Sequence, residues 1–170
     1  ELAQTNKVLA KVEETGLHVW VVHLAGSLLS FLAGYVNAAS LNLWGRTVTH
    51  VSGLVTKLGV ELEQEDDPGA QLFWQLLSFL AGSTLCGLVI GKSQVHFGLA
   101  LYGIALLQAS ALLFLAFAFA GEDAGIYLTA CSMGLQNGLA TSFSGAVIRT
   151  THVTGIVTDV GLQVWRLVGR

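Results

Sequence analysis

Four long uncharged stretches constrain this chain more than any other feature of its sequence. No Asp, Glu, Lys or Arg occurs at residues 15–45, 68–91, 93–121 or 124–148. Each stretch is long enough to cross a bilayer as a helix, which needs roughly 20 apolar residues. A water-soluble helical bundle would instead show a polar face at every third or fourth position. The pattern therefore predicts an all-α fold, a polytopic transmembrane helix bundle.

The composition agrees with a membrane location and limits the partners. Charged residues make up 11% of the 170 residues and hydrophobic ones 53%, whereas soluble domains carry about a quarter charged residues. We expect a multi-pass integral membrane protein with the lipid bilayer as its main partner; the particular membrane and the orientation are left open. The net charge of -3, without a basic cluster, predicts no nucleic-acid partner. Cys86 and Cys131 lie in apolar stretches and are interpreted as buried thiols.

The four uncharged stretches, with two shorter segments that follow the first and the fourth, indicate about six observed spans. We expect these spans at about residues 18–43, 48–62, 70–91, 95–120, 126–148 and 150–167. The second and the sixth are short and rich in hydroxyl groups, so other helices must shield them from lipid. Residues 1–17 are predicted to form an interfacial or flexible N-terminal segment, and residues 18–170 a single transmembrane helical domain.

Two blocks of the sequence, residues 34–59 and 134–161, resemble each other. The first contains GYVN and THVSG, and the second contains GLQN and THVTG in the same order. Chance similarity between apolar segments would reproduce Leu and Val rather than an ordered set of Gly, Asn, Thr and His, so we interpret the blocks as an internal duplication. With three spans between their starts, both copies would cross the membrane in the same direction. This predicts a parallel internal repeat, in which equivalent residues face each other.

The polar residues shared by the two blocks are the candidate substrate or ligand site. They are Asn37, His50, Ser52, Asn137, His152 and Thr154. For the two asparagines, a structural hydrogen bond across a helix interface competes with substrate contact. The two histidines have three interpretations: an interhelical hydrogen bond, a proton-titrating group in a water-filled path, or an axial ligand to a metal, haem or chlorophyll. The cofactor is therefore left unknown, and no metal site is predicted.

One pair of opposite charges also occupies matching positions in the two blocks. Lys57 lies in the first and Asp159 in the second. The membrane penalises each charge alone, so one hypothesis is a buried ion pair between them. The alternative is that each side chain separately extends to the membrane surface.

Glycines recur at positions that suit close helix packing in lipid. Without a side chain, a glycine lets two helix backbones approach each other, and pairs spaced as GxxxG are typical of such contacts. The glycines predicted to pack helices are Gly34, Gly53, Gly87, Gly91, Gly134, Gly138 and Gly155.

The motifs of the second block resemble those of the YoaK-like family, multi-pass membrane proteins classed as a domain of unknown function. The resemblance lies in GLQNG at 134–138, THVTG at 151–155 and the Thr and Gly that follow, with GYVNAAS at 34–40 as the looser counterpart in the first half. It extends over roughly residues 18–168. The family usually has an acidic residue where Asn37 stands, which argues against a cation site in the first block. It also implies one further C-terminal span beyond the sequence seen here.

Two functions follow from these patterns. The repeat, the short polar spans and the paired polar residues favour a small-solute or ion carrier. The alternative is a non-catalytic accessory or scaffold subunit of a larger membrane complex, with other membrane subunits as partners and with bound lipid or pigment. An enzyme is not expected, and no catalytic residues are assigned, because the sequence contains no GxSxG, HExxH or carboxylate dyad.

Overall fold

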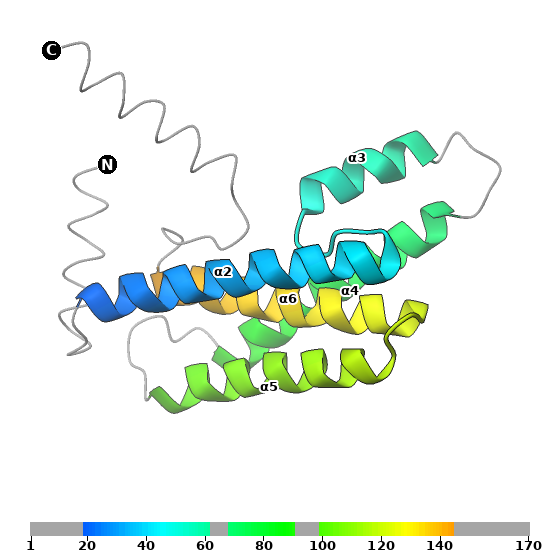
Figure 1. The fold of residues 1–170 in the computed structure, drawn as a ribbon. Coiled ribbons are helices and arrows are strands. Elements are labelled where there is room, and N and C mark those ends of the chain that lie inside the picture. The colour runs from blue at the N-terminus through cyan, green and yellow to red at the C-terminus, as the bar shows by residue number, and fades with distance from the viewer. Residues whose placement is uncertain (1–18, 62–67, 91–98, 145–170) are drawn as a thin grey trace, which may run out of the picture.

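The computed structural model describes residues 19–61, 68–90 and 99–144, and they form helices and the connections between them (Figure 1). The helices are α2 (Val19–Trp44), α3 (Val51–Glu61), α4 (Pro68–Ile90), α5 (Leu99–Ala118) and α6 (Asp123–Ser144). The all-α fold is confirmed. The N-terminal segment 1–17 and the sixth span at 150–167 lie outside the described residues, so the total span count stays a prediction.

The ends of the helices follow from local sequence signals. Gly45 ends α2 with a positive φ of 67°, and its N–H donates to the carbonyl of Leu41 at 3.0 Å. Glycine adopts this left-handed conformation at little cost. Pro68 occupies the first position of α4, where its missing N–H removes no helical hydrogen bond. Asp123 opens α6, where its carboxylate lies at the positive end of the helix dipole.

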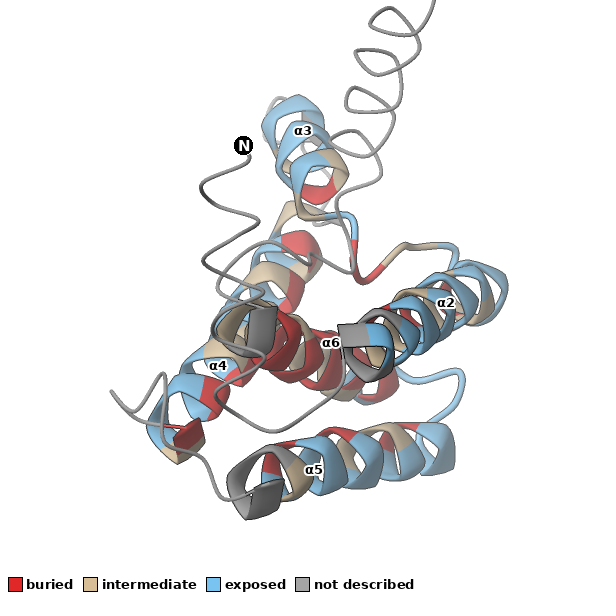
Figure 2. Cartoon of the chain, turned by 90° about the vertical axis from the view of Figure 1, so that its left-hand side faces the viewer, coloured by how far each residue is buried: buried red, intermediate tan, exposed pale blue. Residues whose placement is uncertain are grey.

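Helix α6 occupies the centre of the bundle. It contacts α4, α5 and α2, whereas α3 contacts α4. Figure 2 shows the buried positions concentrated on α6 and the exposed positions on the outer faces of the helices around it. The central helix is therefore shielded on several sides by more apolar neighbours.

Helices α4 and α6 cross at two glycines. A Cβ atom added to Gly82 would collide with the carbonyl group of Cys131, and one added to Gly134 would collide with the carbonyl group of Phe79. The hydroxyl of Ser83 donates to the carbonyl of Gly134 at 3.0 Å across the same crossing. Small residues thus bring two helix backbones into direct contact, as they do at helix interfaces in membranes.

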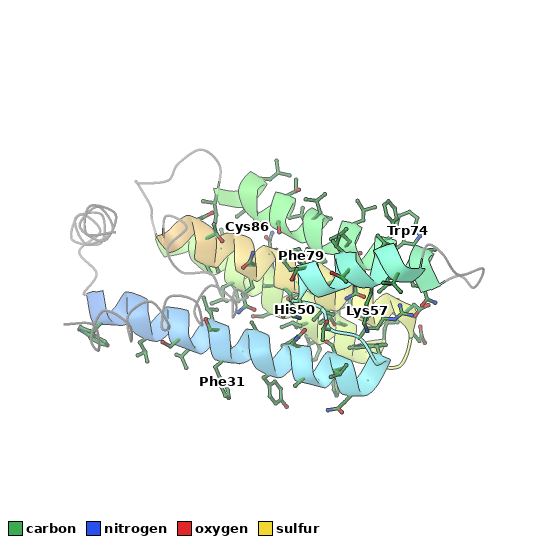
Figure 3. All side chains as sticks on the ribbon, turned by 90° about the horizontal axis from the view of Figure 1, so that it is seen from above. Phe31, His50, Lys57, Trp74, Phe79 and Cys86 are labelled. Atoms are coloured by element: carbon green, nitrogen blue, oxygen red, sulfur yellow. The ribbon has the colours of Figure 1, made fainter. Side chains whose placement is uncertain are left out.

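The outer surface of the bundle is strongly apolar. Phe114 is 83% exposed, Phe117 77% and Leu88 74%, and Figure 3 shows Phe31 pointing away from the other helices. Conversely, several polar side chains are buried, and these include Gln75, Ser132 and Gln136. Within the described residues, the stretches Leu24–Trp44 of α2 and Gly69–Ile90 of α4 are long and apolar enough to cross a membrane.

The second predicted span, residues 48–62, contains a helix shorter than a full crossing needs. Its helix α3 has 11 residues and rises about 16 Å, roughly half the thickness of the hydrocarbon core. In Figure 1 the chain turns back after α2 toward the middle of the bundle, and α3 then runs outward again toward the start of α4. The segment enters the bundle and leaves it at the same end.

The parallel arrangement predicted for the two blocks is also wrong for their first helices. Gln136 of α6 donates to the carbonyl of Leu29 of α2 at 2.9 Å, and Trp44 at the end of α2 donates to the carbonyl of Glu122 just before α6 at 2.9 Å. Residue numbers rise along one helix as they fall along the other, so α2 and α6 are antiparallel. The prediction counted residues 48–62 as one crossing of the membrane. That extra crossing reversed the predicted direction of every later helix, including α6.

Candidate functional site

The connection between α2 and α3, residues 45–50, folds back into the bundle and is called the re-entrant connection below. Its Val48 is 2% exposed and belongs to an apolar cluster with Ala33 of α2 and Ile126, Ala130 and Met133 of α6. Buried backbone outside regular secondary structure carries N–H and C=O groups that need hydrogen-bond partners. The positions of these partners define the site.

Asn37 of α2 supplies the first partner. Its side-chain Oδ1 accepts hydrogen bonds from the backbone N–H groups of Val48 at 2.9 Å and Thr49 at 3.1 Å. Asn37 lies seven residues before the end of α2 at Trp44, which places the contact about 10 Å inside the end of that helix. The asparagine amide therefore holds non-helical backbone at depth within the bundle.

Gln75 of α4 holds the same backbone from the opposite helix. Its Nε2 donates to the carbonyl of Thr47 at 2.6 Å. The peptide group between Thr47 and Val48 is thus bound through its oxygen to α4 and through its N–H to Asn37 on α2. Two side-chain amides replace the helical hydrogen bonds that this peptide lacks.

Two buried polar atoms beside the re-entrant connection have no hydrogen-bond partner in the described part of the chain. They are Oε1 of Gln75 and Oγ of Ser40, on side chains that are 0% and 1% exposed. Ser40 follows Asn37 by three residues on α2, so both lie on the helix face toward the connection. Thr49 is also buried. We call Asn37, Ser40, Thr49 and Gln75 the polar seat.

A second set of polar contacts joins the helices at the end of the bundle where α4 and α6 begin. The guanidinium of Arg46 donates to Oε1 of Gln71 on α4, and Nε2 of Gln71 donates to the carboxylate of Asp123 on α6 at 3.1 Å. The glutamine amide accepts from the cation and donates to the anion, so both of its ends are satisfied. This arrangement, the Arg46–Gln71–Asp123 clasp, ties the re-entrant connection to the starts of α4 and α6.

The sequence-predicted polar residues of the first block do not lie together in the structure. Asn37 lies in the polar seat. His50 and Ser52 are exposed at the start of α3, and the imidazole of His50 lies beside Gly53. Lys57 is exposed on α3 (Figure 3). Of the first-block candidates, only Asn37 contacts the re-entrant connection from another helix.

The second-block candidates are described only in part. Asn137 lies on α6 and is partly buried. His152, Thr154 and Asp159, with the glycine at 155, lie outside the described residues, so the proposed Lys57–Asp159 pair stays a prediction. Within residues 19–61, 68–90 and 99–144, no group of three His, Cys, Asp or Glu side chains is arranged to hold a metal ion.

The predicted packing glycines also divide into two groups. Gly134 lies at the crossing with α4, and a Cβ on Gly138 would be 3.0 Å from the Cβ of Cys86. By contrast, no described atom beyond the local helix backbone lies within 4 Å of such a Cβ at Gly34 or Gly87, and at Gly53 the nearest atoms belong to His50. Gly91 lies outside the described residues. The sequence also missed Gly82, the α4 glycine at the crossing.

Sequence reasoning missed most of the polar seat and the whole clasp. Gln71 and Gln75 stand outside the two repeated blocks, and Ser40, although it ends GYVNAAS, has no hydroxyl counterpart at the matching position of the second block. A signal was nevertheless present: Gln71 and Gln75 are one turn apart on α4 in an otherwise apolar stretch, which places both on the same helix face.

Comparison with known proteins places the chain in a family without giving it an activity. No curated protein and no solved structure matches it. A family model described as a protein of unknown function, DUF1275, matches residues 25–170. This range includes all of the polar seat, the clasp and both sequence blocks. The chain therefore belongs to the DUF1275 family.

Proposed function

We propose that this chain is a multi-pass integral membrane protein that carries a small solute through the bundle and performs no catalysis. The observation that carries this proposal is the re-entrant connection, whose Thr47–Val48 peptide group is held between Asn37 and Gln75. Non-helical backbone at membrane depth is tolerated where it is buried in protein or lines a cavity. In carriers, such interrupted helices form the substrate site near the middle of the bilayer.

The distribution of polar and apolar side chains supports the membrane location. Phe114, Phe117 and Leu88 would face water in a soluble protein, at a cost set by their exposed apolar area. In lipid this cost disappears. Buried Gln75 and Gln136, which donate to backbone carbonyls, are then protected from hydrocarbon by the surrounding helices.

The antiparallel pair of α2 and α6 supports a carrier in a second way. These helices contain the starts of the two similar blocks, with Asn37 on α2 and Asn137 on α6. A duplication whose copies run in opposite directions is an inverted repeat, and carriers use such repeats to expose one site alternately to the two sides of the membrane. In this proposal the two blocks are the two halves of such an inverted repeat.

Reconstitution into liposomes tests the proposal. Flux of a panel of small neutral solutes, cations and anions is measured for the purified chain, for Asn37→Ala and for Asn42→Ala, an exposed asparagine on the same helix. We expect at least one solute to cross faster than in empty liposomes, with a loss in Asn37→Ala and none in Asn42→Ala. Flux equal to that of empty liposomes across the whole panel would refute the carrier.

A second candidate, an accessory subunit of a membrane complex, is favoured by a different observation. Gly34 and Gly87 lie exposed on outward faces, with no described atom near the position of a Cβ. Exposed small residues allow a helix of another subunit to approach closely. Substituting Gly34 by Leu should then release a co-purifying membrane protein, and a chain that purifies alone from mild detergent would count against this candidate.

A further inference from the structure

From the polar seat we infer that the solute is small, uncharged and a hydrogen-bond donor, such as a urea-like or polyol-like molecule; the inference rests on the proposed carrier function. Two side chains of the seat carry buried atoms without a partner among the described residues, Oε1 of Gln75 and Oγ of Ser40. An amide oxygen can only accept hydrogen bonds, and a hydroxyl both accepts and donates. A ligand that fits both atoms must donate at least one hydrogen bond.

Two other polar atoms of the seat are already engaged. Oδ1 of Asn37 accepts from two backbone N–H groups, and Nε2 of Gln75 donates to the Thr47 carbonyl. The buried atoms of the seat that have no partner in the described chain are Oγ of Ser40 on α2 and Oε1 of Gln75 on α4. Leaving a buried polar atom unpaired costs free energy, which a ligand with a matching donor recovers on binding.

The charges near the seat favour an uncharged ligand. None of the buried residues in the described chain is Asp, Glu, Lys or Arg. A charged ligand in the seat would therefore lack a buried opposite charge, which is strongly disfavoured. Arg46, which precedes Thr47 in the sequence, and Asp123 both bind Gln71 in the clasp. Their opposite signs leave the clasp without a net charge.

Ser40→Ala provides a specific test because the hydroxyl makes no hydrogen bond in the described chain. Removing an unpaired buried hydroxyl should leave the fold intact or raise its melting temperature, while the solute loses one partner. We expect urea or glycerol flux in proteoliposomes to fall about 2- to 10-fold, the effect of one neutral hydrogen bond. The matched control is Ser110→Ala on α5, whose exposed hydroxyl bonds only within its own helix, and it should leave flux unchanged.

Gln75→Met is the second variant, because it keeps the side-chain length and removes the accepting oxygen, although it also removes the Nε2 donor to the Thr47 carbonyl. Gln108→Met, at an exposed glutamine of α5, is its control. Thermal unfolding in detergent establishes that each variant is folded before its flux is measured. Gln75→Met should reduce neutral-solute flux and Gln108→Met should not.

The probes separate the failure of this inference from failure of the carrier proposal. Stopped-flow light scattering follows urea and glycerol, and a trapped pH dye follows methylammonium and acetate. Ser40-dependent flux of methylammonium or acetate, with no flux of urea or glycerol, would overturn the uncharged ligand and leave a carrier. Neutral flux that is unchanged in both Ser40→Ala and Gln75→Met would overturn the seat. The absence of any flux would overturn the carrier itself.

Discussion

Alanine substitution at the glycines of α4 and α6 should have opposite effects at positions that look alike in the sequence. At Gly82 the added methyl group would collide with the carbonyl of Cys131, and at Gly134 with that of Phe79. These obstacles are backbone atoms and cannot rotate away, so the helices must separate. Overpacking costs about 3 kcal/mol at its upper range, and alanine regains about 1 kcal/mol of helix propensity, so the expected net loss is about 2 kcal/mol.

The same substitution at Gly34 and Gly87 meets no described atom within 4 Å. Only the gain in helix propensity remains, so stability should stay the same or rise by up to about 1 kcal/mol. Thermal unfolding in detergent measures the difference: Gly82→Ala and Gly134→Ala should lower the Tm by about 4–8 °C, and Gly87→Ala should not. Equal effects of Gly82→Ala and Gly87→Ala would refute the proposed crossing of α4 and α6.

Three further substitutions examine the seat, the clasp and the outer surface. Asn37→Ala should destabilise the fold by about 2–4 kcal/mol, because two buried N–H groups lose their acceptor, whereas Asn42→Ala should change the unfolding temperature little. Gln71→Leu should cost less than about 1 kcal/mol, because the clasp lies at the exposed end of the bundle; a larger loss in chemical denaturation would show that the clasp is shielded from water. Phe114→Asp should reduce membrane insertion by about 2–3 kcal/mol, the cost of a carboxylate facing lipid, and unchanged insertion in a glycosylation-reporter assay would indicate that Phe114 does not face lipid.

The sequence was sufficient to predict the helices because long uncharged stretches have few alternatives. The stretches at 15–45 and 68–91 became α2 and α4, and their lengths alone set the class of fold. Residues 48–62, which contain Lys57 and Glu61, do not form such a stretch, and hydropathy alone predicted a span there. A short apolar helix such as α3 satisfies hydropathy whether it crosses the membrane or returns to the same side, and its depth is decided by Asn37 and Gln75, which lie on other helices.

The candidate site was predicted only where a polar residue belonged to a conspicuous pattern. Asn37 stood out because GYVN recurs as GLQN. The structure shows hydrogen bonds from the backbone at residues 48 and 49 to its side chain, and its contact with a substrate stays a prediction. Gln75 has no such counterpart within a motif. Its contact with Thr47 joins residues from separate elements, and one sequence provides no information about which residues meet across helices.

Labelling from the two sides of the membrane tests the re-entrant connection most directly. In a chain with Cys86 and Cys131 replaced by alanine, Arg46→Cys and Val60→Cys report the two ends of the segment that contains α3. A membrane-impermeant maleimide is applied to sealed vesicles of one orientation and then to vesicles of the opposite orientation. Reaction of both positions from the same side is the expected result. Reaction from opposite sides would show that this segment crosses the bilayer, which would contradict the account.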